Sequence, residues 1–208
     1  MFQNLRLNLW AWSSTVKFIL IPVSEKPIVF FSENGSYRNY LQPVIRYLTV
    51  ELKRKIHYVT SDPADPWLLA PKTNMHAHYV GSGRVRTTFF ETLNCRVLVT
   101  TTPGLDIHHI KRSRNRVHYV YLHHSIVSSH MIYRTGAFDH FDSILCVGPH
   151  HEQETRQWEQ FKGLSQKRLF QHGYGPLDSL IEQGEASKGP HLSKDGAKCI
   201  LLAPTWGK

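Results

Sequence analysis

Short apolar runs alternate with polar turns and helical stretches along the chain from residue 27 onward. Apolar runs of strand length predict strands, and longer amphipathic stretches with Pro near the start and Gly at the end predict helices. Residues 62–83 carry several prolines and glycines and are expected to be loop-rich. Strands alternating with helices are typical of an α/β fold with a Rossmann-like, doubly wound parallel sheet. The predicted strands are 27–35, 56–61, 95–105, 116–125, 141–148 and 168–175, and the predicted helices are 37–55, 84–94, 149–163 and 176–184.

The strand that begins near Val117 ends in three polar residues, His123, His124 and Ser125. In doubly wound sheets, ligands bind at the carboxyl ends of the strands. Other predicted strands also end in polar or glycine-containing segments, which read SENG (32–35), TTTPG (100–104) and GYG (173–175). We therefore expect these four segments to face one crevice.

The composition changes near the end of the chain. Residues 184–197 are polar and rich in Gly, Ser and Lys, which is typical of a linker. Residues 198–208 contain the run CILLAP, a strand of the kind that a parallel sheet covers on both faces. We expect residues 27–183 to form one domain and residues 198–208 to be the first strand of a second, truncated domain. Alternatively, this strand adds to the sheet of the first domain.

The N-terminal segment, residues 1–26, is apolar but interrupted by Ser13, Ser14, Thr15 and Lys17. It is too short and too broken for a spanning helix, which needs about 20 apolar residues. It also lacks the small-residue cleavage site of a signal peptide. Two interpretations remain open: a helix lying in a membrane interface, and a segment packed on the domain.

The chain of 208 residues carries a formal net charge of +9, which favours an anionic partner such as nucleic acid, a phosphate-rich substrate or a membrane surface. Two basic clusters, 53–55 and 111–116, stand out, although each is also typical of a solvated helix end or loop. The second cluster leads into the strand that carries the histidines, so Arg112, Arg114 and Arg116 are candidates for attracting an anionic acceptor. No groove-reading motif accompanies these clusters, and we expect no nucleic-acid partner.

Other chemistries have weak support. Cys95, Cys146 and Cys199 lie in or beside predicted buried strands without C-x-x-C spacing, which favours reduced core thiols in a cytoplasmic protein. No nucleophile elbow, dinucleotide fingerprint or P-loop is present, so no cofactor is expected. Among 14 histidines close pairs arise by chance, and nothing fixes converging metal ligands, so we expect no metal at the three close pairs His76/His78, His108/His109 and His123/His124.

A histidine at a strand end suits general-base chemistry, because its ordinary pKa is about 6.5. It can take the proton of an attacking hydroxyl, which transfer of a phosphoryl or glycosyl group to an alcohol requires. For His124 this role and that of a hydrogen-bonded loop imidazole carry similar weight.

Residues 27–206 resemble the CDP-glycerol glycerophosphotransferase family, the teichoic-acid-type polymerases and primases. Four segments carry the resemblance in the order of the family: YLHHS, GAFDHFDSILCVGPHHEQE, HGYGPLDSL and ILLAPTWGK. The family has a GT-B fold of two Rossmann-like domains, in which the first takes the acceptor and the second binds the CDP-activated donor. The resemblance implies that this chain holds the acceptor domain and only the start of the donor domain.

The implied reaction moves glycerol phosphate from CDP-glycerol to a hydroxyl of an anionic phosphopolymer or lipid-linked acceptor, at the inner face of the plasma membrane. The family's base histidine maps on His124, with His123 as a neighbouring possibility. The resemblance marks further positions, which are Ser125, Gly173 and Tyr174 on the acceptor side and Pro204, Thr205 and Trp206 at the start of the donor domain.

Two departures from the family pattern distinguish this chain. The strand ends in His-His-Ser-Ile where the family has His-Gly-Thr-Pro, and Gly175 and Pro176 replace the usual Pro-Arg pair. The second departure weakens the case for a phosphate contact at that turn. A GT-B glycosyltransferase using a nucleotide sugar and a non-catalytic module that binds membranes or polyanions remain alternative functions.

Overall fold

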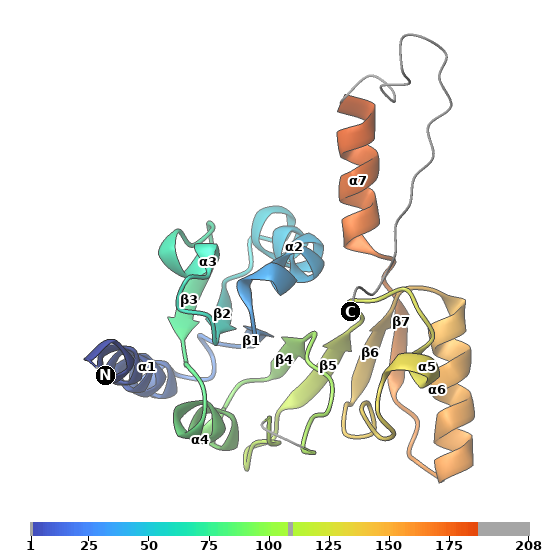
Figure 1. The fold of residues 1–208 in the computed structure, drawn as a ribbon, viewed down its shortest axis with the longest axis horizontal. Coiled ribbons are helices and arrows are strands. Elements are labelled where there is room, and N and C mark those ends of the chain that lie inside the picture. Colours follow the sequence, from blue (N-terminus) through green and yellow to red (C-terminus); the bar gives the residue numbers. More distant parts are fainter. Residues whose placement is uncertain (1, 108–109, 187–208) are drawn as a thin grey trace. The chain divides into compact units, whose positions relative to one another are not determined.

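The computed structural model describes residues 2–107 and 110–186, and its core is a seven-stranded parallel sheet (Figure 1). The described residues up to Gly175 form one compact unit, and residues 176–186 belong to a second. The strands are β1 (Ile28–Ser32), β2 (Ile56–Thr60), β3 (Met75–Tyr79), β4 (Val97–Thr100), β5 (His118–Leu122), β6 (Ser143–Cys146) and β7 (Arg168–Gln171). The α-helices are α1 (Phe2–Leu20), α2 (Arg38–Arg46), α3 (Pro66–Leu69), α4 (Arg84–Thr92), α5 (Ser129–Ile132), α6 (Pro149–Lys162) and α7 (Gly175–Ala186).

The strand order is β3-β2-β1-β4-β5-β6-β7, and every neighbouring pair is parallel. The first strand, β1, lies in the interior of the sheet. The chain then builds one half through β2 and β3, and it returns beside β1 with β4 to build the other half. This order confirms the predicted Rossmann-like, doubly wound fold. The direction of winding reverses between β1 and β4, where such folds place ligands beyond the carboxyl ends of the strands.

The sheet separates two apolar clusters, because successive side chains of a strand point to opposite faces. One cluster combines strand residues with side chains from α1 and α4, and the other with side chains from α2 and α3. In β5, Tyr119 and Tyr121 belong to the first cluster, whereas Val120 and Leu122 belong to the second. This alternation continues at the two histidines that follow β5.

The expectation of a loop at residues 62–83 is wrong, because the structure places α3 and β3 there. β3 is an edge strand of sequence MHAHY, in which only Met75 and Tyr79 are buried. Its two histidines hide the apolar pattern that reveals the other strands. Helix α1 lies beside this edge, and Ser14 Oγ accepts a hydrogen bond from the backbone N–H of Tyr79 at 3.1 Å.

Helix α1 packs on the domain through one face. Phe18 is fully buried in the core, and Ala11 lies against Tyr79 and Val85. Buried Lys26 holds the end of the helix, because its Nζ donates to the carbonyls of Phe18 at 2.7 Å and Ile19 at 3.2 Å. Basic side chains near a helix C-terminus commonly bond to the carbonyls that have no partner within the helix. Burial lowers the pKa of Lys26. Among residues 2–107 and 110–186, none of the helices combines the length and the apolar character that a membrane span requires.

Several predictions from the sequence concern residues that lie outside the described ranges 2–107 and 110–186. They concern most of the linker, the strand at 198–208 with Pro204, Thr205 and Trp206, the third cysteine Cys199, and the pair His108/His109. The other two cysteines, Cys95 and Cys146, are buried free thiols, and burial raises the pKa of each to about 12. Such thiols are protonated and unreactive at neutral pH.

Candidate functional site

His124 lies two residues beyond the end of β5, at the carboxyl edge of the sheet. Its imidazole is half-buried and faces the side of the sheet that α2 covers, in line with the alternation along β5. The aromatic rings of Tyr37 and Tyr40 lie edge-on to the imidazole, with centroid distances of 5.4 and 5.8 Å. Segments around β1 and β5 therefore meet at this imidazole, as the sequence predicts.

Both ring nitrogens of His124 lie near tyrosine hydroxyls. Nδ1 is 3.1 Å from the hydroxyl of Tyr121, and Nε2 is 3.4 Å from the hydroxyl of Tyr133. Tyr174 lies next to Tyr40, with a centroid distance of 6.0 Å. These side chains form a tyrosine cluster around the imidazole, whose members are Tyr37, Tyr40, Tyr121, Tyr133 and Tyr174.

The environment keeps His124 neutral near physiological pH. Burial lowers the pKa of His124, and a hydrogen bond with the backbone of Thr101 opposes this shift in part. Burial also raises the pKa of Tyr133, and it raises that of Tyr174 to about 12, so neither phenol ionises. A neutral imidazole has one nitrogen with a free lone pair, which is the form that a general base needs. The longer contact, at Nε2, is the one that an incoming hydroxyl displaces more easily.

His123 is not an alternative base, because its side chain is only 2% exposed. It points to the other face of the sheet, where its ring stacks on that of His151 at 3.8 Å and lies near Phe138. Neither of its nitrogens has a hydrogen-bond partner within residues 2–107 and 110–186. Burial, followed by the charges of neighbouring histidines, lowers its pKa to about 3. The two adjacent histidines thus have different surroundings, which the sequence alone did not separate.

The turn after β7 reaches the same edge of the sheet. Gly173 has a φ of +80°, a value that favours glycine, and the turn brings Tyr174 to Tyr40. Gly175 packs so closely on α2 that an added Cβ would lie 2.4 Å from Cγ of Pro43. This contact gives a physical reason for a glycine at position 175. Ser125 is half-buried, and its Oγ accepts a hydrogen bond from the backbone N–H of Val127 at 3.4 Å.

The three candidate arginines lie at the opposite edge of the sheet. Arg112, Arg114 and Arg116 precede β5, whereas His124 follows it, so the length of the strand separates them from the imidazole. Five residues of strand span about 16 Å. The structure therefore does not bring these arginines, which the sequence suggested as attracting an anionic acceptor, together with His124.

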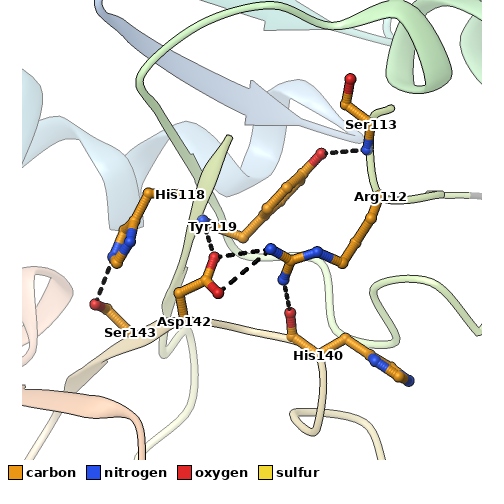
Figure 2. A network of polar contacts seen from close by, with 7 residues as sticks. All are labelled: Arg112, Ser113, His118, Tyr119, His140, Asp142 and Ser143. Atoms are coloured by element: carbon orange, nitrogen blue, oxygen red, sulfur yellow. Dashed lines mark hydrogen bonds and ion pairs between the residues drawn. The ribbon is translucent and has the colours of Figure 1, made fainter. Parts of the chain in front are cut away.

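Arg112 serves a structural network, which Figure 2 shows. Its guanidinium donates to the carboxylate of Asp142 at 3.2 and 3.3 Å and to the backbone carbonyl of His140. It also lies over the ring of Tyr119, 4.6 Å from the centroid. Asp142 accepts a further bond from the backbone N–H of Tyr119 at 2.7 Å. Arg112 thus fastens the loop before β5 to the turn before β6, while Arg114 and Arg116 are exposed.

Two pockets flank the segment 133–137, which sequence analysis did not mark. One has a volume of about 210 Å³ and lies against α6, and the other, of about 390 Å³, lies against Pro103 and Gly104 after β4. Tyr133 and Arg134 line both. Arg134 is exposed and takes part in none of the ion pairs found within residues 2–107 and 110–186. The only signal in the sequence was a lone arginine in an irregular segment.

No family model, curated protein or solved structure matches this chain. Within the described residues, no group of three or more His, Cys, Asp or Glu side chains has the arrangement of a metal site. The chemistry that the arrangement around His124 supports is proton abstraction by a neutral imidazole in a polar, aromatic environment.

Proposed function

We propose that this chain is the acceptor half of a CDP-glycerol-dependent glycerophosphotransferase, with His124 as the general base. The observation that carries the proposal is the position of a neutral, half-buried imidazole at the carboxyl edge of a doubly wound sheet. The resemblance of residues 27–206 to the glycerophosphotransferase family supplies the reaction class, and the donor-binding half is assigned to a second GT-B domain.

In the proposed reaction, Nε2 of His124 takes the proton of an acceptor hydroxyl. The oxygen attacks the β-phosphorus of CDP-glycerol, the bond between this phosphorus and the bridging oxygen breaks, and CMP leaves with the electron pair. Positioning and charge stabilisation supply most of the acceleration in phosphoryl transfer, and the base adds to them. Tyr133 holds the imidazole until the hydroxyl replaces its own weak contact.

Arg134 is the cation best placed to bind an anionic acceptor at this edge. It follows Tyr133 directly and, among the described residues, is the only charged one that lines the pocket beside Pro103 and Gly104. The pocket against α6 is less suited to an anion, because the carboxylates of Asp139, Glu154 and Glu159 also line it. A guanidinium binds phosphate oxygens through two parallel hydrogen bonds, which suits a phosphopolymer end. In this proposal Arg134 takes over the role that the sequence suggested for Arg112, Arg114 and Arg116.

Donor specificity tests the reaction class. A protein that joins this chain to its donor half is expected to release CMP from CDP-glycerol when a glycerol phosphate oligomer is supplied, and to leave UDP-sugars intact. The 208-residue chain by itself is expected to release no CMP. Chromatographic measurement of free nucleotides separates these results. Transfer from a UDP-sugar would identify a nucleotide-sugar glycosyltransferase instead. CMP release by the 208-residue chain alone would contradict the assignment of donor binding to a second half.

The outer face of α1 supports contact with a membrane surface. Five exposed apolar side chains follow one another at spacings of four, three, four and three residues, and we call them the α1 stripe: Leu5, Leu9, Trp12, Val16 and Ile19. The helix contains no acidic residue, and it carries Arg6 and Lys17. Apolar and tryptophan side chains combined with basic ones are typical of helices that lie in anionic membrane interfaces. A second copy of α1 would oppose like charges, so an anionic bilayer is the better partner.

Substitution within the α1 stripe tests this surface. Leu9→Glu is expected to lower the affinity for phosphatidylcholine vesicles containing phosphatidylglycerol by about tenfold or more, since burial of one leucine contributes about 1.5–3 kcal/mol. Vesicle flotation measures the bound fraction. The matched control is Leu69→Glu, because Leu69 in α3 is 72% exposed and lies outside the stripe. Equal losses in the two variants, or no binding by the original chain, would exclude docking through α1.

A further inference from the structure

A basic pocket of about 590 Å³ lies at the amino-terminal edge of the sheet, at the other end of the strands from His124. Two loops supply most of its wall, one before β1 and one before β2, and side chains of β2 and β3 complete it. The lining residues are Ile21, Ser24, Glu25, Pro27, Lys53, Arg54, Lys55, His57, His76 and His78. Neither the proposed transfer reaction nor the resemblance uses any of them.

Three consecutive cations dominate the lining of the basic pocket. Lys53, Arg54 and Lys55 are all exposed, and none of them belongs to an ion pair in the part of the chain that the structure describes. Glu25 is the only carboxylate among the lining residues. Three positive charges against one negative charge leave an excess of two, which matches the charge of a phosphomonoester dianion.

Two of the three histidines in the pocket add no charge, and their hydrogen bonds explain why. The Nε2–H of His57 donates to the carbonyl of Glu25 at 3.3 Å, so its Nδ1 must accept the bond from Nε2–H of His78 at 2.9 Å. Protonation of His57 at Nδ1 would place two N–H groups against each other. Burial and nearby positive charges lower the pKa of His57 to about 4 and that of His78 to about 3.

The hydrogen bonds of this histidine pair leave neither ring with an N–H group for a ligand. Exposed His76 is stacked beside His57 at 5.3 Å, and its ring nitrogens bond to no other group in the described part of the chain. The donors for an anion are therefore the side chains of Lys53, Arg54, Lys55 and His76. Lysine and arginine provide strong, charge-assisted hydrogen bonds to phosphate oxygens.

Lys53 adopts a backbone conformation that glycine would occupy more easily. Its φ is +49°, it follows the helical turn Tyr47–Glu51, and the N–H of Arg54 then bonds to the carbonyl of Leu48 at 2.7 Å. Helices commonly end in this way with glycine at the left-handed position. A lysine at this position does not help the backbone, so its side chain can be removed by substitution to glycine without loss of the local fold.

We propose that this pocket binds the phosphate group of a phosphomonoester, either in solution or as the headgroup of an anionic lipid. Two of the lining residues, Ile21 and Ser24, lie in the segment that follows α1, so the pocket adjoins the end of the helix that carries the α1 stripe. A headgroup bound here would anchor the same end of the chain that the stripe attaches to a bilayer. The site is independent of the proposed transfer reaction, since it lies at the opposite edge of the sheet.

The test measures phosphate affinity at low ionic strength for the original chain and for the variants Lys53→Gly and Lys55→Gln. Inorganic phosphate and glycerol 3-phosphate are titrated while NMR follows the ring signals of His76 and the amides of residues 53–55. Each variant is expected to bind about tenfold more weakly, the effect of losing one charge-assisted hydrogen bond. The melting temperature of Lys53→Gly is expected to be unchanged or higher, which separates lost binding from lost folding.

The matched control is Lys72→Gln, which removes an exposed lysine that does not line the pocket. Its phosphate affinity is expected to equal that of the original chain. A loss as large as that of Lys55→Gln would show that net charge alone attracts the anion, and this would overturn the proposal. Absence of any shift at His76 and residues 53–55 with both phosphates and with lipid would overturn it as well.

A lipid arm distinguishes the two sources of the phosphate. Binding to vesicles of phosphatidylcholine with phosphatidic acid is compared with binding to vesicles matched in surface charge by phosphatidylglycerol, whose phosphate is a diester. Preference for phosphatidic acid that disappears in Lys55→Gln identifies the lipid headgroup as the ligand. Binding of the soluble phosphates without this preference identifies a soluble phosphomonoester.

Discussion

Replacement of His124 by alanine is expected to reduce glycerophosphate transfer by a factor of about 10²–10⁴, which is the usual contribution of a general base. The half-buried ring packs beside Tyr37 and Tyr40 but fills no deep core position, so the melting temperature is expected to stay close to that of the original protein. Initial rates of CMP release, in a protein that joins this chain to the proposed donor half, provide the measurement.

The pH dependence of the same reaction gives a second readout. Because burial lowers the pKa of His124, the imidazole stays neutral down to a pH below its ordinary value of about 6.5. The rate is expected to fall on the acid side of that lowered pKa, and His124→Ala should lose this limb. The control is His140→Ala, which removes a histidine at the amino-terminal edge whose side chain is exposed. If His124→Ala kept normal turnover and the same decrease in rate at low pH, His124 would not be the general base.

Substitution of His123 by phenylalanine is expected to stabilise the protein by about 1–3 kcal/mol, because a buried polar group without partners is replaced by an apolar ring of similar shape. Its folded pKa of about 3 lies below the unfolded value of about 6.5. The unfolded state therefore binds the proton first as pH falls, and stability is lost between these two values. The contribution of His123 to this decrease in the free energy of unfolding approaches about 1.4 kcal/mol for each pH unit below 6.5. His123→Phe is expected to remove this contribution.

His151→Phe is the matched control, because the two rings form one stack. Nε2 of His151 donates to the carbonyl of Val127 at 2.9 Å, and Nδ1 accepts from the N–H of Val147 at 3.4 Å. Loss of these bonds is expected to destabilise the protein by about 1–3 kcal/mol. Urea unfolding at pH 7 and pH 5 measures both variants. A destabilised His123→Phe, or an unchanged pH dependence, would mean that His123 has a partner in the folded protein.

Most of the fold could be predicted from the sequence, since six of the seven strands are apolar runs bounded by turn residues. The seventh, β3, was not predicted because His76 and His78 interrupt its apolar pattern. These residues are tolerated because β3 is an edge strand, where α1 covers the chain only in part. The burial of one face of α1 was one of two open interpretations, because an amphipathic helix has the same pattern on a domain and on a membrane.

The site was predictable where it depends on strand direction. His124 was found because it follows a strand, and the same rule places Arg112, Arg114 and Arg116 at the opposite edge, since residues before a parallel strand lie at its amino end. The three arginines were suggested because they are close to His124 in sequence, although the strand between them separates the two groups in space. The tyrosine cluster could not be predicted, because its members are spread from residue 37 to residue 174 and only the strand order brings them together.

The divergent surroundings of the paired imidazoles after β5 have a genetic consequence. Gain or loss of a single codon within β5 would shift both histidines by one position and so exchange the faces of the sheet to which they point. His124 would then point into the aromatic interior, and His123 would point to the face of the tyrosine cluster. Natural variation in this strand is therefore expected to consist of replacements that conserve its length.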